Sequence, residues 1–114
     1  MKKVLIFFSV ILIITILACS KNSDSVTTNC GGIVKSYSSD INPIIQNSCA
    51  INAGCHGAGS TNGPGPLTNY SQVFSARVAI RTAVASGTMP QNSSLSTADK
   101  NSIICWIDSG APNN

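Results

Sequence analysis

The sequence predicts an all-α fold, a single small domain built from three main helices. Three segments, near residues 38–48, 70–86 and 96–109, carry apolar side chains at helical spacing between residues that start or stop helices. The alternation of apolar and polar residues that marks a strand is absent from the sequence, and so is any internal repeat. A length of 114 residues suits one domain with appendages.

The first helix is expected to end at about Ser48 and so to deliver Cys49 to its end. The segment Ser38–Asp40 supplies N-cap residues and an acidic side chain for the first turn. Pro43 is acceptable only near the beginning of such a helix. One face is formed by isoleucines at i, i+3 and i+4 spacing: Ile41, Ile44 and Ile45.

Residues 57–69 are expected to form a loop, because Gly63–Pro66 is too rigid and too broken for a helix or strand. The second helix should run from about Tyr70 to Ser86, with Gly87 placed to end it. Its pattern is not sharply amphipathic. Two sets of side chains compete for its buried face: Phe74, Val78 and Arg81 on one side, and Val73, Ile80 and Val84 flanking or opposing them.

The third helix begins with a capping-box pattern, in which Ser96 is followed by Asp99 in place of the usual glutamate. The helix should extend to about Ser109, where Gly110 and then Pro112 stop it. Its apolar stripe consists of Ile103, Ile104 and Ile107.

The N-terminus has the layout of a secretory signal peptide, which we assign to residues 1–18. Two lysines precede the apolar run Val4–Leu17, and a small alanine stands directly before Cys19. This junction resembles the lipobox of bacterial lipoproteins, so Cys19 is expected to be the lipidated first residue of the mature chain. The alternative is an uncleaved transmembrane helix, but that requires roughly 20 apolar residues and the run is shorter.

Residues 19–36 are expected to form a lipid-anchored tether, because this stretch is mostly polar and has no periodicity. Residues 37–114 would then form the folded domain. The expected location is the bacterial cell envelope, where the N-terminal lipid holds the protein on the periplasmic or outer-membrane side of a membrane.

The mature chain is almost uncharged and poor in large apolar side chains. Removing Lys2 and Lys3 from the seven basic residues leaves five against four acidic ones, a net charge near +1. Such a charge does not indicate a nucleic-acid partner. So small a domain with so little apolar surface needs a disulfide, a metal or a cofactor to stabilise it.

The pair Cys55-His56 carries the most specific chemical signal. A histidine directly after a cysteine, with Cys49 upstream, is the arrangement used to attach haem covalently. The thiols add to haem vinyl groups, and the imidazole becomes the proximal ligand of the iron. The usual spacing is C-x-x-C-H, whereas five residues separate the two cysteines here, which leaves open whether Cys49 is bonded as well.

Met89 is the only methionine besides Met1, and we expect it to be the distal ligand of the iron. The alternative is a methionine that only fills space in the core. A metal-bound imidazole usually donates its other N–H to an oxygen. The expected acceptor is a backbone carbonyl in the loop, at Pro64 or Pro66. Leu67, Tyr70 and Trp106 are candidates to cover the haem edge, with the core as the preferred place for Trp106.

Cys30 and Cys105 are the disulfide candidates, because an exported chain permits disulfides and this pair would close a loop of about 75 residues. Two alternatives are that both are buried free thiols, or that Cys30 pairs with Cys49 if haem uses Cys55 alone. Sequence by itself does not establish the connectivity.

Several short segments together resemble the single-haem cytochrome c domains of bacterial surface lipoproteins, which are similar to the planctomycete-type cytochrome c domains. The segments, spread over about residues 37–112, are Tyr37–Cys49, Gly54–Gly57, Leu67–Tyr70, Ser86–Pro90, Leu95-Ser96 and Trp106–Pro112. The resemblance implies an all-α cytochrome c-like fold around covalently bound haem c, with the first and last helices crossing. It also implies thioethers at Cys49 and Cys55, and His56 and Met89 as the iron ligands.

The function expected from these features is electron transport by a lipid-anchored cytochrome, not an enzyme, with transient protein redox partners and no small-molecule substrate. A haem peroxidase would need an open iron site and a distal acid–base residue, and the only histidine is already assigned. The other alternative is a haem-free surface binding module, stabilised by disulfides or by zinc on Cys49, Cys55, His56 and Cys105.

Overall fold

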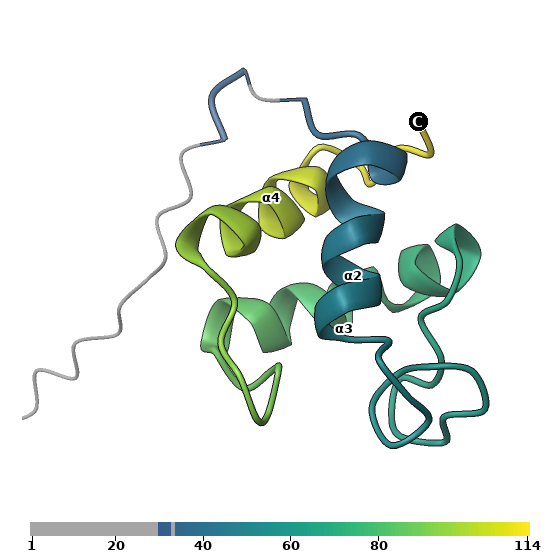
Figure 1. Ribbon diagram of the computed structural model, residues 1–114. Coiled ribbons are helices and arrows are strands. Elements are labelled where there is room, and N and C mark those ends of the chain that lie inside the picture. The colour runs from purple at the N-terminus through teal and green to yellow at the C-terminus, as the bar shows by residue number, and fades with distance from the viewer. Residues whose placement is uncertain (1–29, 33) are drawn as a thin grey trace, which may run out of the picture.

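In the computed structural model, the described part of the chain contains three α-helices and one short π-helical segment (Figure 1). The structure describes residues 30–32 and 34–114, and this part of the chain contains no strand, which confirms the expected all-helical class. The elements in chain order are η1 (Tyr37–Ile41), α2 (Asn42–Ser48), α3 (Tyr70–Ser86) and α4 (Thr97–Asp108).

The expected signal peptide (residues 1–18), the lipidation site Cys19 and the tether up to residue 29 lie outside the described residues. Within residues 30–32 and 34–114, no helix combines the length and the apolar character needed to cross a bilayer.

The first helical segment begins two residues earlier than the sequence pattern predicts. The N-cap is Ser36, whose hydroxyl accepts a hydrogen bond from the Ser39 N–H, while its own N–H donates to the Asp40 carboxylate at 2.8 Å. Asp40 therefore stabilises the first turn, as its position predicts. The π-helical turn of η1 leads directly into α2, where Pro43 occupies an early position, and the helix ends at Ser48 as expected.

Helix α3 has the bounds that its caps predict. The Asn69 side chain accepts a hydrogen bond from the Gln72 N–H at its start, and Gly87 ends it in the left-handed conformation at φ +71°. Of the two competing faces, the core takes the one formed by Val73, Ala76, Ile80 and Val84, whereas Val78 on the other face is 68% exposed.

Helix α4 is capped by Ser96, whose hydroxyl accepts from the Asp99 N–H at 3.0 Å. The reciprocal bond differs from a full capping box, because the Asp99 carboxylate accepts from the Ser96 hydroxyl and not from its backbone N–H. The helix stops before Gly110, which has a positive φ of 102°. Its buried residues are Ile103, Ile104, Cys105 and Trp106.

An aromatic cluster joins the beginning of the domain to its last helix. The rings of Tyr37 and Trp106 lie 5.7 Å apart, and Tyr70 packs edge-on against Tyr37 at 5.0 Å. The Trp106 indole N–H donates to the Pro112 carbonyl, so the fully buried indole has a partner for its polar atom. These contacts place η1 against α4 and build the core behind the loops that carry the candidate site.

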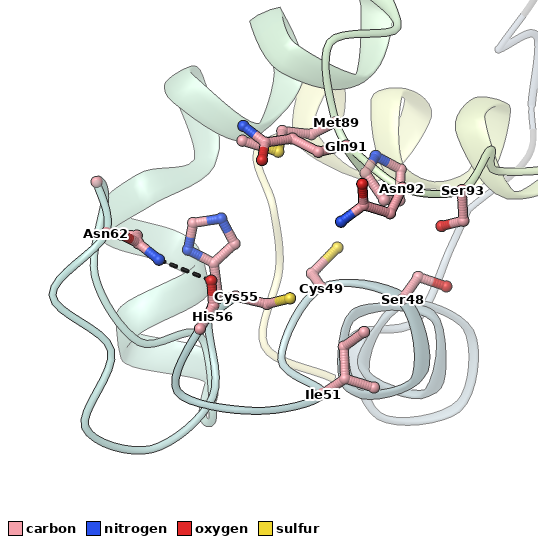
Figure 2. A pocket seen from close by; sticks show the side chains of 13 residues that line it. Ser48, Cys49, Ile51, Cys55, His56, Asn62, Met89, Gln91, Asn92 and Ser93 are labelled. Atoms are coloured by element: carbon pink, nitrogen blue, oxygen red, sulfur yellow. Dashed lines mark hydrogen bonds between the residues drawn. The ribbon is translucent and has the colours of Figure 1, made fainter.

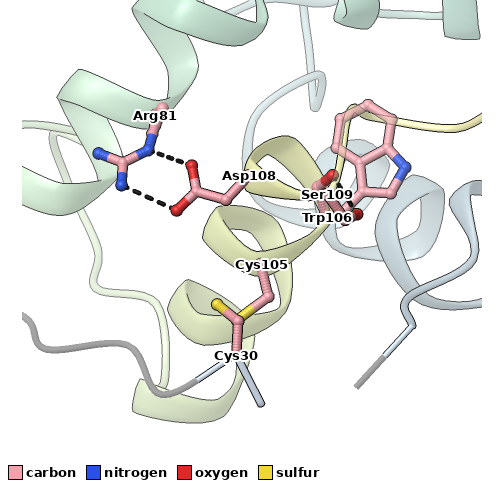
Figure 3. The surroundings of a disulfide bond; sticks show 6 residues. All are labelled: Cys30, Arg81, Cys105, Trp106, Asp108 and Ser109. Atoms are coloured by element: carbon pink, nitrogen blue, oxygen red, sulfur yellow. Dashed lines mark hydrogen bonds and ion pairs between the residues drawn. A yellow bond between two sulfur atoms is a disulfide. The ribbon is translucent and has the colours of Figure 1, made fainter. Parts of the chain in front are cut away.

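A disulfide joins Cys30 to Cys105 on α4, with the two Cα atoms 5.3 Å apart (Figure 3). This is the cysteine pairing predicted from the need of a small exported domain for a stabilising cross-link. The bond ties the segment before η1 to the last helix. On the same helix, Asp108 accepts two hydrogen bonds from Arg81 of α3, at 2.6 and 2.9 Å.

Candidate functional site

A cavity of about 500 Å³ opens beside the end of α2 (Figure 2). Its volume lies within the range of about 300–1,000 Å³ typical of small-molecule and cofactor sites. Two loops form it, the one after α2 and the one between α3 and α4. Its lining residues are Ser48, Cys49, Ile51, Gly54, Cys55, His56, Asn62, Gly63, Met89, Pro90, Gln91, Asn92 and Ser93. All four residues predicted to hold haem are among them.

His56 is held in place by hydrogen bonds of both its backbone N–H and its backbone carbonyl. Its N–H donates to the Cys49 carbonyl at 2.9 Å, and its own carbonyl accepts from the Leu67 N–H at 2.7 Å. The side chain is buried, and Nδ1 lies 3.0 Å from the Gly65 carbonyl oxygen. A carbonyl only accepts, so Nδ1 carries the proton in this contact, and in the neutral ring Nε2 is the nitrogen whose lone pair can bind a metal.

The acceptor for His56 corrects a sequence prediction. Pro64 or Pro66 was expected to offer the carbonyl, but the structure uses Gly65, which lies between them with a positive φ of 97°. The left-handed conformation turns the Gly65 carbonyl toward the ring, and it is open to glycine without the steric cost that other residues meet. The loop was identified correctly from its composition, and the position within it was wrong by one residue.

Both cysteines of the motif are free thiols that line the cavity. In Figure 2 their sulfur atoms point into the space below Met89. Burial raises the pKa of the Cys49 thiol, and the neighbouring Cys55 raises it further. Cys49 is therefore held as a neutral thiol, which does not repel a second thiol beside it.

Met89 comes from the loop after α3 and lies on the other side of the cavity from the loop that carries the cysteines (Figure 2). Its backbone is fastened to the end of α3, because the N–H groups of Thr88 and Met89 both point to the Ala83 carbonyl, at 3.0 and 3.4 Å. The half-buried side chain lines the cavity and does not belong to the hydrophobic core. Its thioether is thus available as a ligand.

The rim of the cavity carries polar side chains that sequence reasoning did not single out: Ser48, Asn62, Gln91, Asn92 and Ser93. Gln91, Asn92 and Ser93 directly follow Met89-Pro90 in the chain. This closeness to Met89 was the only feature of the sequence that could have placed them at the site. Leu67, Tyr70 and Trp106, considered as cover for a haem edge, do not line the cavity. Leu67 and Trp106 are buried in the core, and Tyr70 donates its hydroxyl to the Ala111 carbonyl.

The zinc alternative does not assemble. Cys105 is bonded to Cys30 in the disulfide, whereas Cys49 and Cys55 are free thiols. Among residues 30–32 and 34–114, no three side chains of the histidine, cysteine, aspartate or glutamate type gather closely enough to hold a metal ion.

The residues around the cavity have the chemical groups that haem c requires. The thiols of Cys49 and Cys55 lie beside the His56 imidazole, whose Nδ1 is already hydrogen-bonded to Gly65. The Met89 thioether lies across the cavity from them. Comparisons with protein-family models, curated proteins and solved structures find no match for this chain.

Proposed function

We propose that this protein is a single-haem c-type cytochrome that carries electrons between redox partners in the bacterial cell envelope. One observation carries the proposal: Cys49, Cys55, His56 and Met89 line a single cavity, and His56 is oriented with Nε2 free. Sequence distance alone does not require this, since Met89 comes from a different loop than the other three.

Each residue has a distinct role in this proposal. The thiols of Cys49 and Cys55 would form the covalent attachment, and His56 Nε2 and the Met89 sulfur would hold the iron. When bound, haem c supplies an iron centre that changes its oxidation state by one electron. If His56 and Met89 both held the iron, the chain would leave it no open position for oxygen or peroxide, which favours electron transfer over enzymatic chemistry.

We also propose the finer description of the fold, a cytochrome c-like arrangement. The contact between η1 and α4, made through Tyr37 and Trp106, supports it. So does the position of the cysteine–histidine loop directly after the first helix. The lipid on Cys19 would anchor the domain through the tether of residues 19–36, within which Cys30 is bonded to α4.

The first test is to express the full chain in cells that mature c-type cytochromes, followed by absorption spectroscopy and mass spectrometry of the purified protein. We expect a thioether-linked haem with sharp bands in the reduced state that survives acid–acetone extraction. Mass spectrometry reports the lipid and the haem on the same chain. A folded but colourless product from such cells would contradict the proposal.

The second test addresses the distal ligand. Replacing Met89→Ala should remove the far-red ligand band of the oxidised protein and lower the reduction potential, because methionine ligation raises it. Gln91→Ala in the same loop is the matched control, since this side chain also lines the cavity but offers no sulfur. If the Met89 variant keeps the potential and the band of the wild type, another group is the distal ligand.

A further inference from the structure

The five-residue spacer between the motif cysteines, Ala50–Gly54, is folded into a closed turn around Asn52. The Asn52 carbonyl accepts hydrogen bonds from the N–H groups of Cys55 and Gly57, at 3.0 and 2.8 Å. The Asn52 side-chain oxygen also accepts from the Cys55 N–H, at 3.1 Å. One residue in the middle of the spacer thus holds the second half of the attachment motif.

The turn brings the two ends of the motif into direct contact. The His56 N–H donates to the Cys49 carbonyl at 2.9 Å, although seven positions separate the two residues in sequence. The extra residues therefore bulge outward and do not push the two cysteines apart. Both thiols line the same cavity as a result.

The turn is packed too closely for side chains on its inner side. A β-carbon at Gly57 would lie 2.7–2.9 Å from three backbone atoms of Asn52, closer than real β-carbons approach other atoms. Gly57 is buried, whereas Asn52 itself is exposed to solvent. A change at Asn52 should therefore loosen this turn without opening the hydrophobic core.

We propose that Asn52 is a positioning residue, which folds the widened spacer so that Cys49 and Cys55 both form thioethers to one haem. This inference rests on the proposed function. In each addition the thiol S–H adds across a vinyl C=C bond: the sulfur bonds to one vinyl carbon and the hydrogen goes to the other. The addition is neutral overall and needs no external oxidant or reductant.

The test counts thioethers in the full chain, matured in the same cells and analysed by mass spectrometry of haem-bearing peptides. The wild type should carry two. Asn52→Ala should lower the doubly linked fraction several-fold, with Cys55 retained as the single bond. Asn52→Asp keeps a side-chain oxygen at this position and should restore most of the double linkage.

Two further variants separate positioning from general damage. Asn47→Ala, on an exposed part of α2 in the described structure, should leave two thioethers. Gly57→Ala places a β-carbon against the backbone of Asn52, so it should disrupt the same turn and reproduce the loss of double linkage expected for Asn52→Ala. Circular dichroism establishes which variants keep their helices. If the Gly57 variant does not fold, the thioether counts of Asn52→Asp and Asn52→Ala test the role of the Asn52 side chain by themselves.

A readout without haem completes the test. In full chain produced without haem attachment, hydrogen exchange at the Cys55 amide should be slow in the wild type and several-fold faster in Asn52→Ala, but unchanged in Asn47→Ala. Equal thioether counts in wild type and Asn52→Ala, or a wild type with one thioether, would overturn the role of Asn52 and leave the cytochrome proposal standing. A folded wild type without haem would overturn both.

Discussion

The ring of His56 is oriented by a glycine carbonyl nine residues further along the chain. Because the acceptor belongs to the backbone, no side-chain substitution removes it directly, and the ring depends on the conformation of the loop. The loop is fastened in turn, since the Leu67 N–H bonds to the His56 carbonyl and the Gln46 side chain donates to the Leu67 carbonyl at 3.0 Å. In the proposed function, an imidazole held in this way would need little reorganisation to bind the iron.

The pair Arg81–Asp108 gives a pH-dependent prediction at the scale of single residues. The hydrogen bonds from Arg81 lower the pKa of Asp108, so the contribution of the pair to stability is present above the usual carboxyl pKa and is lost as pH falls through the lowered value. Both side chains are about 40% exposed, at 43% and 40%, so solvent screening limits the effect.

We expect Asp108→Asn to lower the free energy of unfolding by at most about 1 kcal/mol at neutral pH. The difference in stability between variant and wild type should shrink well below about pH 4, because the protonated wild-type carboxyl group is then uncharged, like the asparagine. Urea unfolding at neutral and acidic pH measures both quantities. A loss of the same size at both values of pH would show that charge is not the cause.

At the scale of elements, local signals determine where the helices end, and the disulfide ties the segment before η1 to the last helix. Asn69 and Gly87 bound α3, and Ser96 begins α4, each through hydrogen bonds to residues within a few positions. Such caps are readable from sequence because their partners are neighbours in the chain. The face that α3 buries was not readable, because Val73 and Val78 are equally apolar and only packing against α4 distinguishes them.

The disulfide gives the prediction for these elements. Replacing both partners, Cys30→Ala together with Cys105→Ala, should lower the free energy of unfolding by about 2–5 kcal/mol, because the bridge closes a loop spanning 75 residues and restricts the unfolded chain. Denaturant unfolding of the two proteins measures the difference. Reductant should destabilise the wild type and leave the double variant unaffected; equal sensitivity to reductant would mean that the bridge contributes nothing.

At the scale of the whole molecule, the described domain is nearly uncharged around its cavity. None of the cavity-lining residues is a lysine, arginine, aspartate or glutamate, and Ile51 at the cavity is 61% exposed. Electrostatic steering of partners depends on charge near the contact. The side chains around the cavity therefore contribute no charge that would steer a partner toward it.

We predict that the side chains around the cavity add little to the ionic-strength dependence of electron transfer to small anionic and cationic oxidants, because none of them is charged. Stopped-flow measurements on the haem-loaded protein test this. Gln91→Lys, which adds one charge at the rim, should introduce opposite salt dependences for the two oxidants. A steep salt dependence in the wild type would mean that charges remote from the cavity direct the encounter.

The sequence by itself determined the helical class, the ends of α3 and α4, the loop that holds the imidazole partner, and the residue types gathered for the site. These features depend on periodicity, on caps and on motif chemistry, all of which act over a few residues. Only the tertiary structure decided that Met89 joins the cysteine–histidine loop at one cavity and that Gly65 meets His56. It also decided that Asn52 closes the wide spacer, because its bonds to Cys55 and Gly57 exist only once the loop has folded back on itself.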